Sequence, residues 1–220
     1  MIPGLRYALD LLVPARCAAC GVTGLPCCAD CDQVWGGLSE VARGPTDGLV
    51  PVYALARYEG TARRLTLAYK ERGRRDLAVP LGRAVAGALP QLPGHAGDGW
   101  WLVPAPSRRR ASRGRGGPHV EALAVECAKT LAARGIPAAV APALSLSAGT
   151  KDAVGLSRRE RAANLEGGLR WEPRGRPPPG APVVVLDDVV TTGATAAACT
   201  RVLRENGVTV TAMLALVAAG

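Results

Sequence analysis

Four consecutive apolar residues, Val183 to Leu186, constrain the fold more than any other stretch of the sequence. A short run of this kind predicts a strand that is buried on both faces of a parallel sheet. Two acidic residues, Asp187 and Asp188, follow it, and the small and hydroxyl residues from Thr191 to Thr195 then open a predicted helix. Open α/β sheets bind ligands at the carboxyl ends of their strands. The sequence therefore predicts an α/β protein with a ligand site at this strand end.

The other apolar segments alternate between strand and helix patterns. Strands are expected at residues 50–56, 100–103, 138–146 and 208–217, and helices at 60–69, 76–89, 120–133 and 192–205. This alternation predicts a parallel sheet flanked by helices. The turn-like residues 44–48 predict a boundary between an N-terminal module, 1–45, and a main domain, 46–220.

The loop after the acidic pair has the composition of a phosphate-binding loop. It offers backbone N–H groups, the hydroxyls of three threonines and the positive end of a helix dipole. The two carboxylates beside it can accept hydrogen bonds from a ribose diol. Together these groups predict a site for a pentose 5-phosphate.

Other nucleotide- and phosphate-binding classes fit the sequence less well. A P-loop ATPase needs a lysine after a glycine, and none of Lys70, Lys129 and Lys151 has one before it. A haloacid-dehalogenase-like phosphatase would carry its second acid two residues after the first, where this chain has Val189. The three spaced glycines of a dinucleotide fold are absent after the first strand. A capped helix without a ligand would explain one acid at this position but not two.

Five of the seven cysteines lie near the N-terminus. Cys17 and Cys20 form one pair and Cys28 and Cys31 a second, with two residues inside each pair and seven between the pairs. Four thiolates at this spacing predict a tetrahedral structural zinc site, and an iron–sulfur cluster is the alternative. Cys27 could replace Cys28, although Cys28 gives the more regular spacing. Cys127 and Cys199 fall in predicted helices and are expected to be buried thiols.

The net charge of +9 comes mostly from arginine, which suits the recognition of phosphate groups. An anionic ligand or partner is therefore expected, although charge alone does not separate a nucleotide from a nucleic acid. No apolar run is long enough to cross a bilayer, so we expect a cytoplasmic protein without membrane insertion.

The segment Val183 to Thr195 resembles, at every position, the 5-phosphoribosyl-1-pyrophosphate (PRPP) signature of type I phosphoribosyltransferases. More narrowly, the chain resembles the ComF family of competence-associated proteins through its cysteine pairs and residues 68–78, 103–106 and 155–164. This resemblance implies a type I phosphoribosyltransferase fold with a small N-terminal zinc module held by four cysteines.

The same resemblance implies roles for individual residues. Asp187 and Asp188 would hold the ribose hydroxyls, and the 5-phosphate would bind Thr191, Thr192, Gly193, Ala194 and Thr195. The pyrophosphate, with Mg²⁺, would bind Ala105, Pro106, Ser107 and Arg108. Arg161 and Asn164 would act in catalysis from a closing loop at 156–169.

Two positions depart from the family pattern. Ala153 replaces a frequent glutamine, and Arg115-Gly116-Gly117-Pro118-His119 stands where many relatives read Arg-Gly-Phe-Asn-Gln. Both changes concern the side of the site that would receive the acceptor. His119 could serve there as a base, or it could be structural.

Two functions remain open from the sequence. The first is an enzyme that transfers a phosphoribosyl group from PRPP to a nitrogen nucleophile and releases pyrophosphate. The second is a non-catalytic accessory protein in competence or DNA uptake that binds single-stranded DNA or a competence helicase.

Overall fold

A computed structural model describes residues 15–93, 99–107, 117–147 and 167–220 of the chain. Its central sheet has six strands in the order β1-β2-β8-β7-β3-β4. Their bounds are β1 (Ser39–Glu40), β2 (Val52–Arg57), β3 (Trp100–Pro104), β4 (Ala138–Val140), β7 (Val183–Val190) and β8 (Val210–Ala218). All neighbouring strands are parallel except β1 and β2, which are antiparallel. The predicted α/β architecture with a mostly parallel sheet is confirmed.

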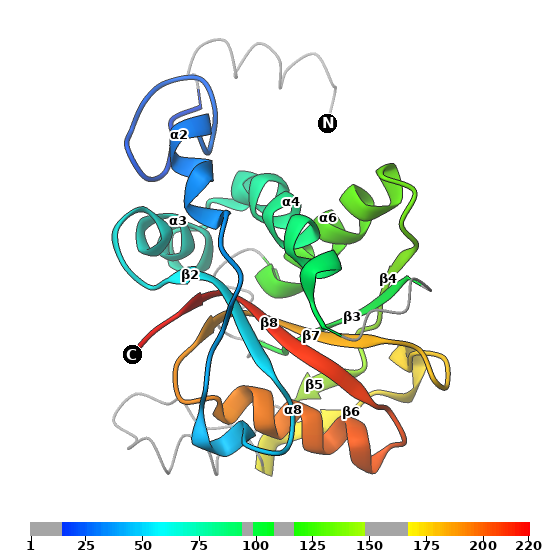
Figure 1. Ribbon diagram of the computed structural model, residues 1–220. Helices are drawn as coiled ribbons and strands as arrows, with labels where there is room; N and C mark the ends of the chain where they lie inside the picture. The colour runs from blue at the N-terminus through cyan, green and yellow to red at the C-terminus, as the bar shows by residue number, and fades with distance from the viewer. Residues whose placement is uncertain (1–14, 94–98, 108–116, 148–166) are drawn as a thin grey trace.

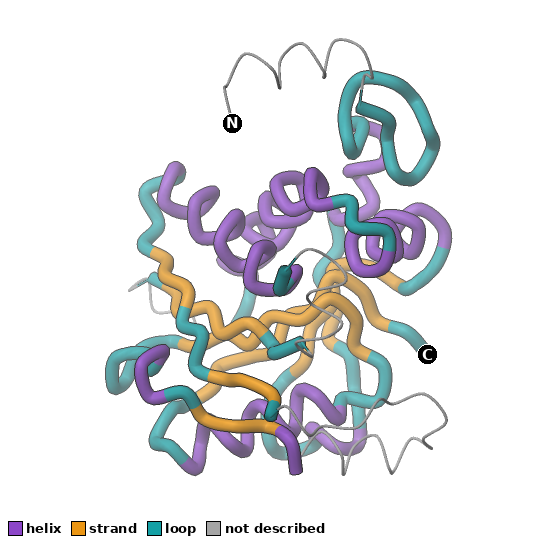
Figure 2. Tube along the Cα trace, turned by 180° about the vertical axis from the view of Figure 1, so that it is seen from behind, coloured by secondary structure: helices purple, strands orange, loops and turns teal. Residues whose placement is uncertain are grey.

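Helices cover both faces of the sheet, which gives three layers (Figure 1). One face carries α3 (Gly60–Glu71), α4 (Ala78–Ala88) and α6 (His119–Ala133). The other carries α8 (Ala194–Glu205) and a small antiparallel sheet of β5 (Leu144–Leu146) and β6 (Leu169–Trp171). Figure 2 shows the same layers from behind.

The sheet separates two apolar clusters, and β7 contributes to both. Val184 and Leu186 belong to the cluster under α3, α4 and α6, whereas Val183 and Val185 belong to the cluster under α8. All four side chains are at most 1% exposed. The prediction that this run is buried on both faces is confirmed.

Several elements differ from the predicted ones. β7 continues to Val190, because Val189 and Val190 are β-branched residues that keep pairing with β8. The acidic pair therefore lies within the strand, near its end, rather than just after it. The single strand expected at 138–146 is divided into β4 and β5 on either side of Pro142. The short strands β1 and β6 were not predicted.

The cysteine-rich segment folds around a short helix, α2 (Ala29–Asp32), and a 3₁₀ turn, Gln33–Trp35. Cys17, Cys31 and Trp35 are buried in the same apolar cluster as α3, α4 and α6. The segment is therefore packed against the main domain. None of the helices in the described residues is both long enough and apolar enough to span a membrane.

Candidate functional site

The topology of the sheet points to one place for a ligand. β3 leads through α6 to β4 on one side, whereas the adjacent β7 leads through α8 to β8 on the other side. The two helices lie on opposite faces of the sheet (Figure 1). A crevice forms outside the carboxyl ends of neighbouring strands whose connections diverge in this way, and ligands bind there. The end of β7 carries Asp187 and Asp188, and the end of β3 leads into Ala105 to Ser107.

The two acids have different surroundings. Asp188 is 3% exposed, and each of its oxygens meets a donor: Lys70 Nζ lies 2.9 Å from Oδ1 and His119 Nε2 lies 2.6 Å from Oδ2. Asp187 is half-buried, and its Oδ1 accepts a hydrogen bond of 2.8 Å from the backbone N–H of Asp188. Asp187 therefore presents the more accessible carboxylate.

These surroundings move the two pKa values in opposite directions. Burial would raise the pKa of Asp188, but the hydrogen bond from His119 and the charge of Lys70 outweigh it and hold this pKa below its usual range. Burial and the negative charge of Asp188 raise the pKa of Asp187 to about 7. Near neutral pH Asp188 is therefore ionised, whereas Asp187 lies close to the midpoint of its titration.

The loop Thr191 to Thr195 turns from β7 into α8 around Gly193, whose φ of +81° is a conformation that favours glycine. Thr192 Oγ1 accepts a hydrogen bond of 3.4 Å from the N–H of Ala194. Arg43 links this loop to the C-terminal end of the chain. Its Nε donates a hydrogen bond to the carbonyl of Thr191, and its Nη2 donates one to Ala219 O at 3.1 Å.

The start of α6 is held by the segment that also supplies Lys70. Tyr69 donates from its hydroxyl to the carbonyl of His119 at 2.5 Å, and the two rings meet edge to face with centroids 5.7 Å apart. Arg75 donates to the carbonyl of Gly117. Two side chains, those of Tyr69 and Arg75, thus fix the place where His119 reaches the acidic pair.

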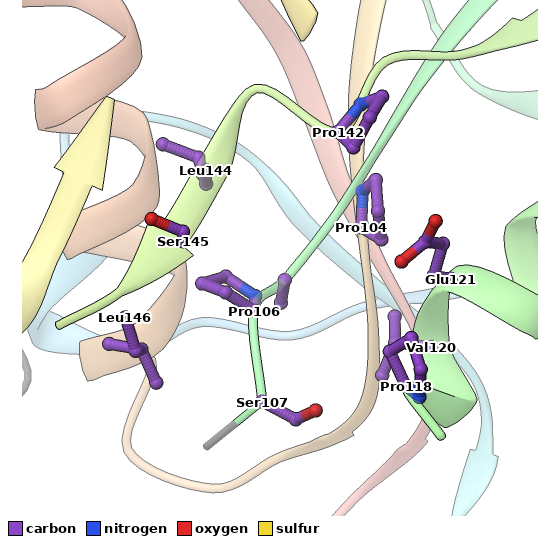
Figure 3. A pocket seen from close by; sticks show the side chains of 11 residues that line it. Pro104, Pro106, Ser107, Pro118, Val120, Glu121, Pro142, Leu144, Ser145 and Leu146 are labelled. Atoms are coloured by element: carbon purple, nitrogen blue, oxygen red, sulfur yellow. The ribbon is translucent and has the colours of Figure 1, made fainter. Parts of the chain in front are cut away.

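A pocket of about 130 Å³ opens beside the end of β3. Figure 3 shows its wall of proline and leucine side chains, with Ser107 at one end and the carboxylate of Glu121 facing Pro104. Pro118 and Val120, which also line it, are the neighbours of His119 in the sequence. The pocket therefore adjoins the acidic pair through the first turn of α6.

Four cysteines form a separate candidate metal site. The Sγ atoms of Cys17, Cys20, Cys28 and Cys31 all lie within 4.8 Å of one another, and those of Cys20 and Cys28 are 3.6 Å apart. A tetrahedral zinc ion with Zn–S bonds of about 2.3 Å places its sulfurs roughly 3.8 Å apart. The cluster thus fits a metal such as zinc.

The neighbouring thiol of Cys27 does not belong to this cluster. Its Sγ lies 3.8 Å from Asp32 Oδ1, and burial raises its pKa to about 12. In contrast, burial of Cys17 is outweighed by hydrogen bonds from the backbone N–H groups of Cys28, Cys20 and Ala19, and its pKa is lowered to about 6. The structure therefore places Cys28, and not Cys27, with the other three cysteines.

The structure brings together most residues that the sequence singled out, and adds three. Arg108, Arg161 and Asn164 lie outside the described residues. Lys70, Arg43 and Tyr69 had no role in the sequence analysis, although Tyr69 and Lys70 belong to the quoted stretch 68–78. The partners described above are 50 to 176 positions away, so no local pattern could have identified them.

No protein-family model and no curated protein matches the chain.

Proposed function

We propose that the chain is a PRPP-binding protein of the type I phosphoribosyltransferase kind, similar to the ComF family. The observation that carries this proposal is the placement of an acidic pair and a hydroxyl-rich loop on one strand end, at a switch point of a mostly parallel sheet. Asp187 would accept hydrogen bonds from the ribose diol, and residues 191–195 would bind the 5-phosphate through backbone N–H groups and threonine hydroxyls.

The pyrophosphate would lie against the second strand end. Ala105 donates its backbone N–H to Leu186 O at 2.8 Å, which ties the loop after β3 to the strand that carries the acids. The side-chain oxygen of Ser107 is buried without a hydrogen-bond partner among the described residues, and a pyrophosphate oxygen at this strand end would accept a hydrogen bond from it. Mg²⁺ would enter with the pyrophosphate, since phosphate oxygens are the ligands this ion prefers, and would neutralise part of its charge.

The pocket of Figure 3 is the proposed place for the nitrogen acceptor. It lies beside the end of β3 and the first turn of α6, its wall is mainly apolar, and Glu121 offers a carboxylate that can accept a hydrogen bond from an N–H group. In the proposed reaction the acceptor nitrogen forms a bond to the anomeric carbon while the bond from that carbon to pyrophosphate breaks. No protein nucleophile is needed, because catalysis would come from orientation and charge stabilisation.

The cysteine cluster would hold one structural zinc ion. Four thiolates complete the tetrahedral shell, so this site would fold the N-terminal segment and would offer no open position for catalysis.

The experiment that tests the proposal compares two small ligands by calorimetry. Ribose 5-phosphate should bind, and 2-deoxyribose 5-phosphate should bind about tenfold more weakly, since it lacks one of the hydroxyls that a carboxylate would receive. Equal affinities would contradict the diol site.

A second arm separates the enzyme from the accessory protein. Purified protein with PRPP and Mg²⁺ is offered a set of amines and bases, and the release of pyrophosphate is measured. Release that depends on an acceptor supports the transferase. PRPP binding without release, together with salt-dependent binding of a single-stranded oligonucleotide, would favour the accessory function.

A further inference from the structure

His119 is a buried histidine that faces the acidic pair from a neighbouring helix. Its side chain is 3% exposed, and its Nε2 lies 2.6 Å from Asp188 Oδ2. Because an ionised carboxylate can only accept, Nε2 must donate in this contact. Nδ1 is buried as well and has no hydrogen-bond partner among the described residues. Among the described residues, the imidazole thus has one hydrogen-bond partner, Asp188, which Nε2 contacts.

Contacts to the backbone and to the ring of His119 hold the imidazole in this orientation. Tyr69 donates to the carbonyl of His119 and packs edge to face against the imidazole. The position is also the start of α6, where the preceding Pro118 restricts the backbone. The donor is therefore pre-positioned by contacts that do not involve the ligand.

The carboxylate of Asp188 has little exposed surface that a ligand could contact. Its side chain is 4% exposed and lies between Lys70 and His119. Its backbone N–H, however, donates to Oδ1 of Asp187 at 2.8 Å. Asp188 therefore also contacts the accessible carboxylate of Asp187, through one backbone hydrogen bond.

We propose that His119 is a positioning residue, which fixes Asp188 through a donated hydrogen bond and thereby holds Asp187 in the orientation that receives the ligand's hydroxyl groups. The two acids then have different tasks: Asp188 is an internal anchor, shared by Lys70 and His119, and Asp187 is the contact to the sugar. This inference rests on the proposed function. It also gives a reason for a histidine at this position that requires no transfer of a proton to the substrate.

The test uses two substitutions that differ in one property. H119Q and H119M introduce side chains of similar length and volume, but only the glutamine amide can donate a hydrogen bond to Asp188. PRPP affinity in the presence of Mg²⁺ is measured by calorimetry for both variants, and thermal melting shows that both are folded. We expect affinity near wild type in H119Q and about tenfold weaker binding in H119M, the factor that ~1.4 kcal/mol produces.

The D188A background isolates the path through Asp188, because alanine has no side-chain oxygen that could accept a hydrogen bond from His119. If His119 acts only through that carboxylate, adding H119M to a folded D188A protein should lower the PRPP affinity no further. Equal affinities in H119Q and H119M, or additive losses in the double variant, would overturn the positioning role. Wild-type protein that fails to bind PRPP would instead overturn the proposed function, and the positioning role with it.

If H119M does not fold, the same comparison is made with H119Q and H119N. The shorter asparagine amide keeps a donor but does not reach Asp188 from the same backbone position, so H119N should bind PRPP more weakly than H119Q. Equal binding by these two variants would count against the proposal.

Discussion

At the scale of single residues, the site depends on groups that lie close together only in the folded chain. Asp188 takes donors from positions 70 and 119, and residues 191–195 are braced by Arg43. The sequence could predict the acids and the threonines, because they are consecutive and follow an apolar run. It could not predict Lys70 as a partner, since that contact exists only once α3 is packed on the sheet.

Gly193 provides a test of the loop at this scale. A Cβ at Gly193 would lie 2.8 Å from Arg43 Cβ and 3.2 Å from Thr46 Cγ2, and the φ of +81° is itself unfavourable for alanine. Gly193→Ala should therefore lower the free energy of unfolding by roughly 1–3 kcal/mol and weaken phosphate binding. Urea unfolding measures the first effect.

Gly180→Ala is the matched control for that substitution. Gly180 has a φ of +75°, but a Cβ there would meet nothing within 4 Å. Gly180→Ala should therefore lower the free energy of unfolding only by the backbone strain, about 1–2 kcal/mol at most, and leave ligand affinity unchanged. If Gly193→Ala is no more harmful than Gly180→Ala in either measurement, the close approach of Arg43 does not constrain the loop.

The raised pKa of Asp187 gives a pH dependence with a defined sign. Its ordinary value is 3.8 and its folded value is about 7, so between these values the folded protein holds a proton that the unfolded chain has released. The contribution of Asp187 to the free energy of unfolding therefore falls as the pH rises through this window.

Asp187→Asn removes that contribution. The variant should lose less stability than the wild type between about pH 5 and about pH 7.5, as measured by urea unfolding at both values. Parallel pH dependences of the two proteins would show that Asp187 is not the group with the raised pKa.

At the scale of elements, the sequence predicted the main strands and helices because their apolar patterns are long. The boundaries that it missed have physical causes. Val189 and Val190 prolong β7 past the acids, and Pro142, which cannot donate a hydrogen bond, stands between β4 and β5. The two residues of β1 and three of β6 are too few to show a period.

The contact between α4 and α6 provides a test at this scale. A Cβ at Gly82 would lie 2.7 Å from Glu126 Cβ and 2.9 Å from the backbone nitrogen of Cys127. Gly82→Ala should push the helices apart and lower the melting temperature, in line with a loss of about 1–3 kcal/mol.

Gly87, in the same helix, should respond in the opposite direction. A Cβ there would meet nothing within 4 Å, and alanine favours the helix over glycine by about 0.5–1 kcal/mol. Gly87→Ala should thus raise the melting temperature. If both substitutions raise the melting temperature, or both lower it, this would contradict the close packing of α4 on α6 at Gly82.

At the scale of the whole molecule, the cysteine segment and the main domain share one apolar cluster. Loss of a metal from the four cysteines should therefore lower the stability of the entire chain and not only of its N-terminal part. The spacing of the cysteines predicted the four ligands. The sequence did not show that Trp35 packs against the main domain.

Two serine substitutions test this account. Cys28→Ser should reduce bound zinc below one ion per chain in elemental analysis and lower the single melting transition, whereas Cys27→Ser should retain the zinc. If Cys27→Ser loses the metal and Cys28→Ser keeps it, the cluster has been assigned to the wrong thiol.

We propose that the end of β7 binds a phosphorylated ribose. The most direct measurement is calorimetric titration of PRPP with Mg²⁺ into wild-type protein, Asp187→Asn, and Glu205→Gln, an equal change of charge at the end of α8. We predict one ligand per chain for the wild type, unchanged binding for Glu205→Gln, and affinity at least about tenfold lower for Asp187→Asn, which loses a charge-assisted hydrogen bond. Equal affinities for wild type and a folded Asp187→Asn protein, or no binding by either, would contradict the claim.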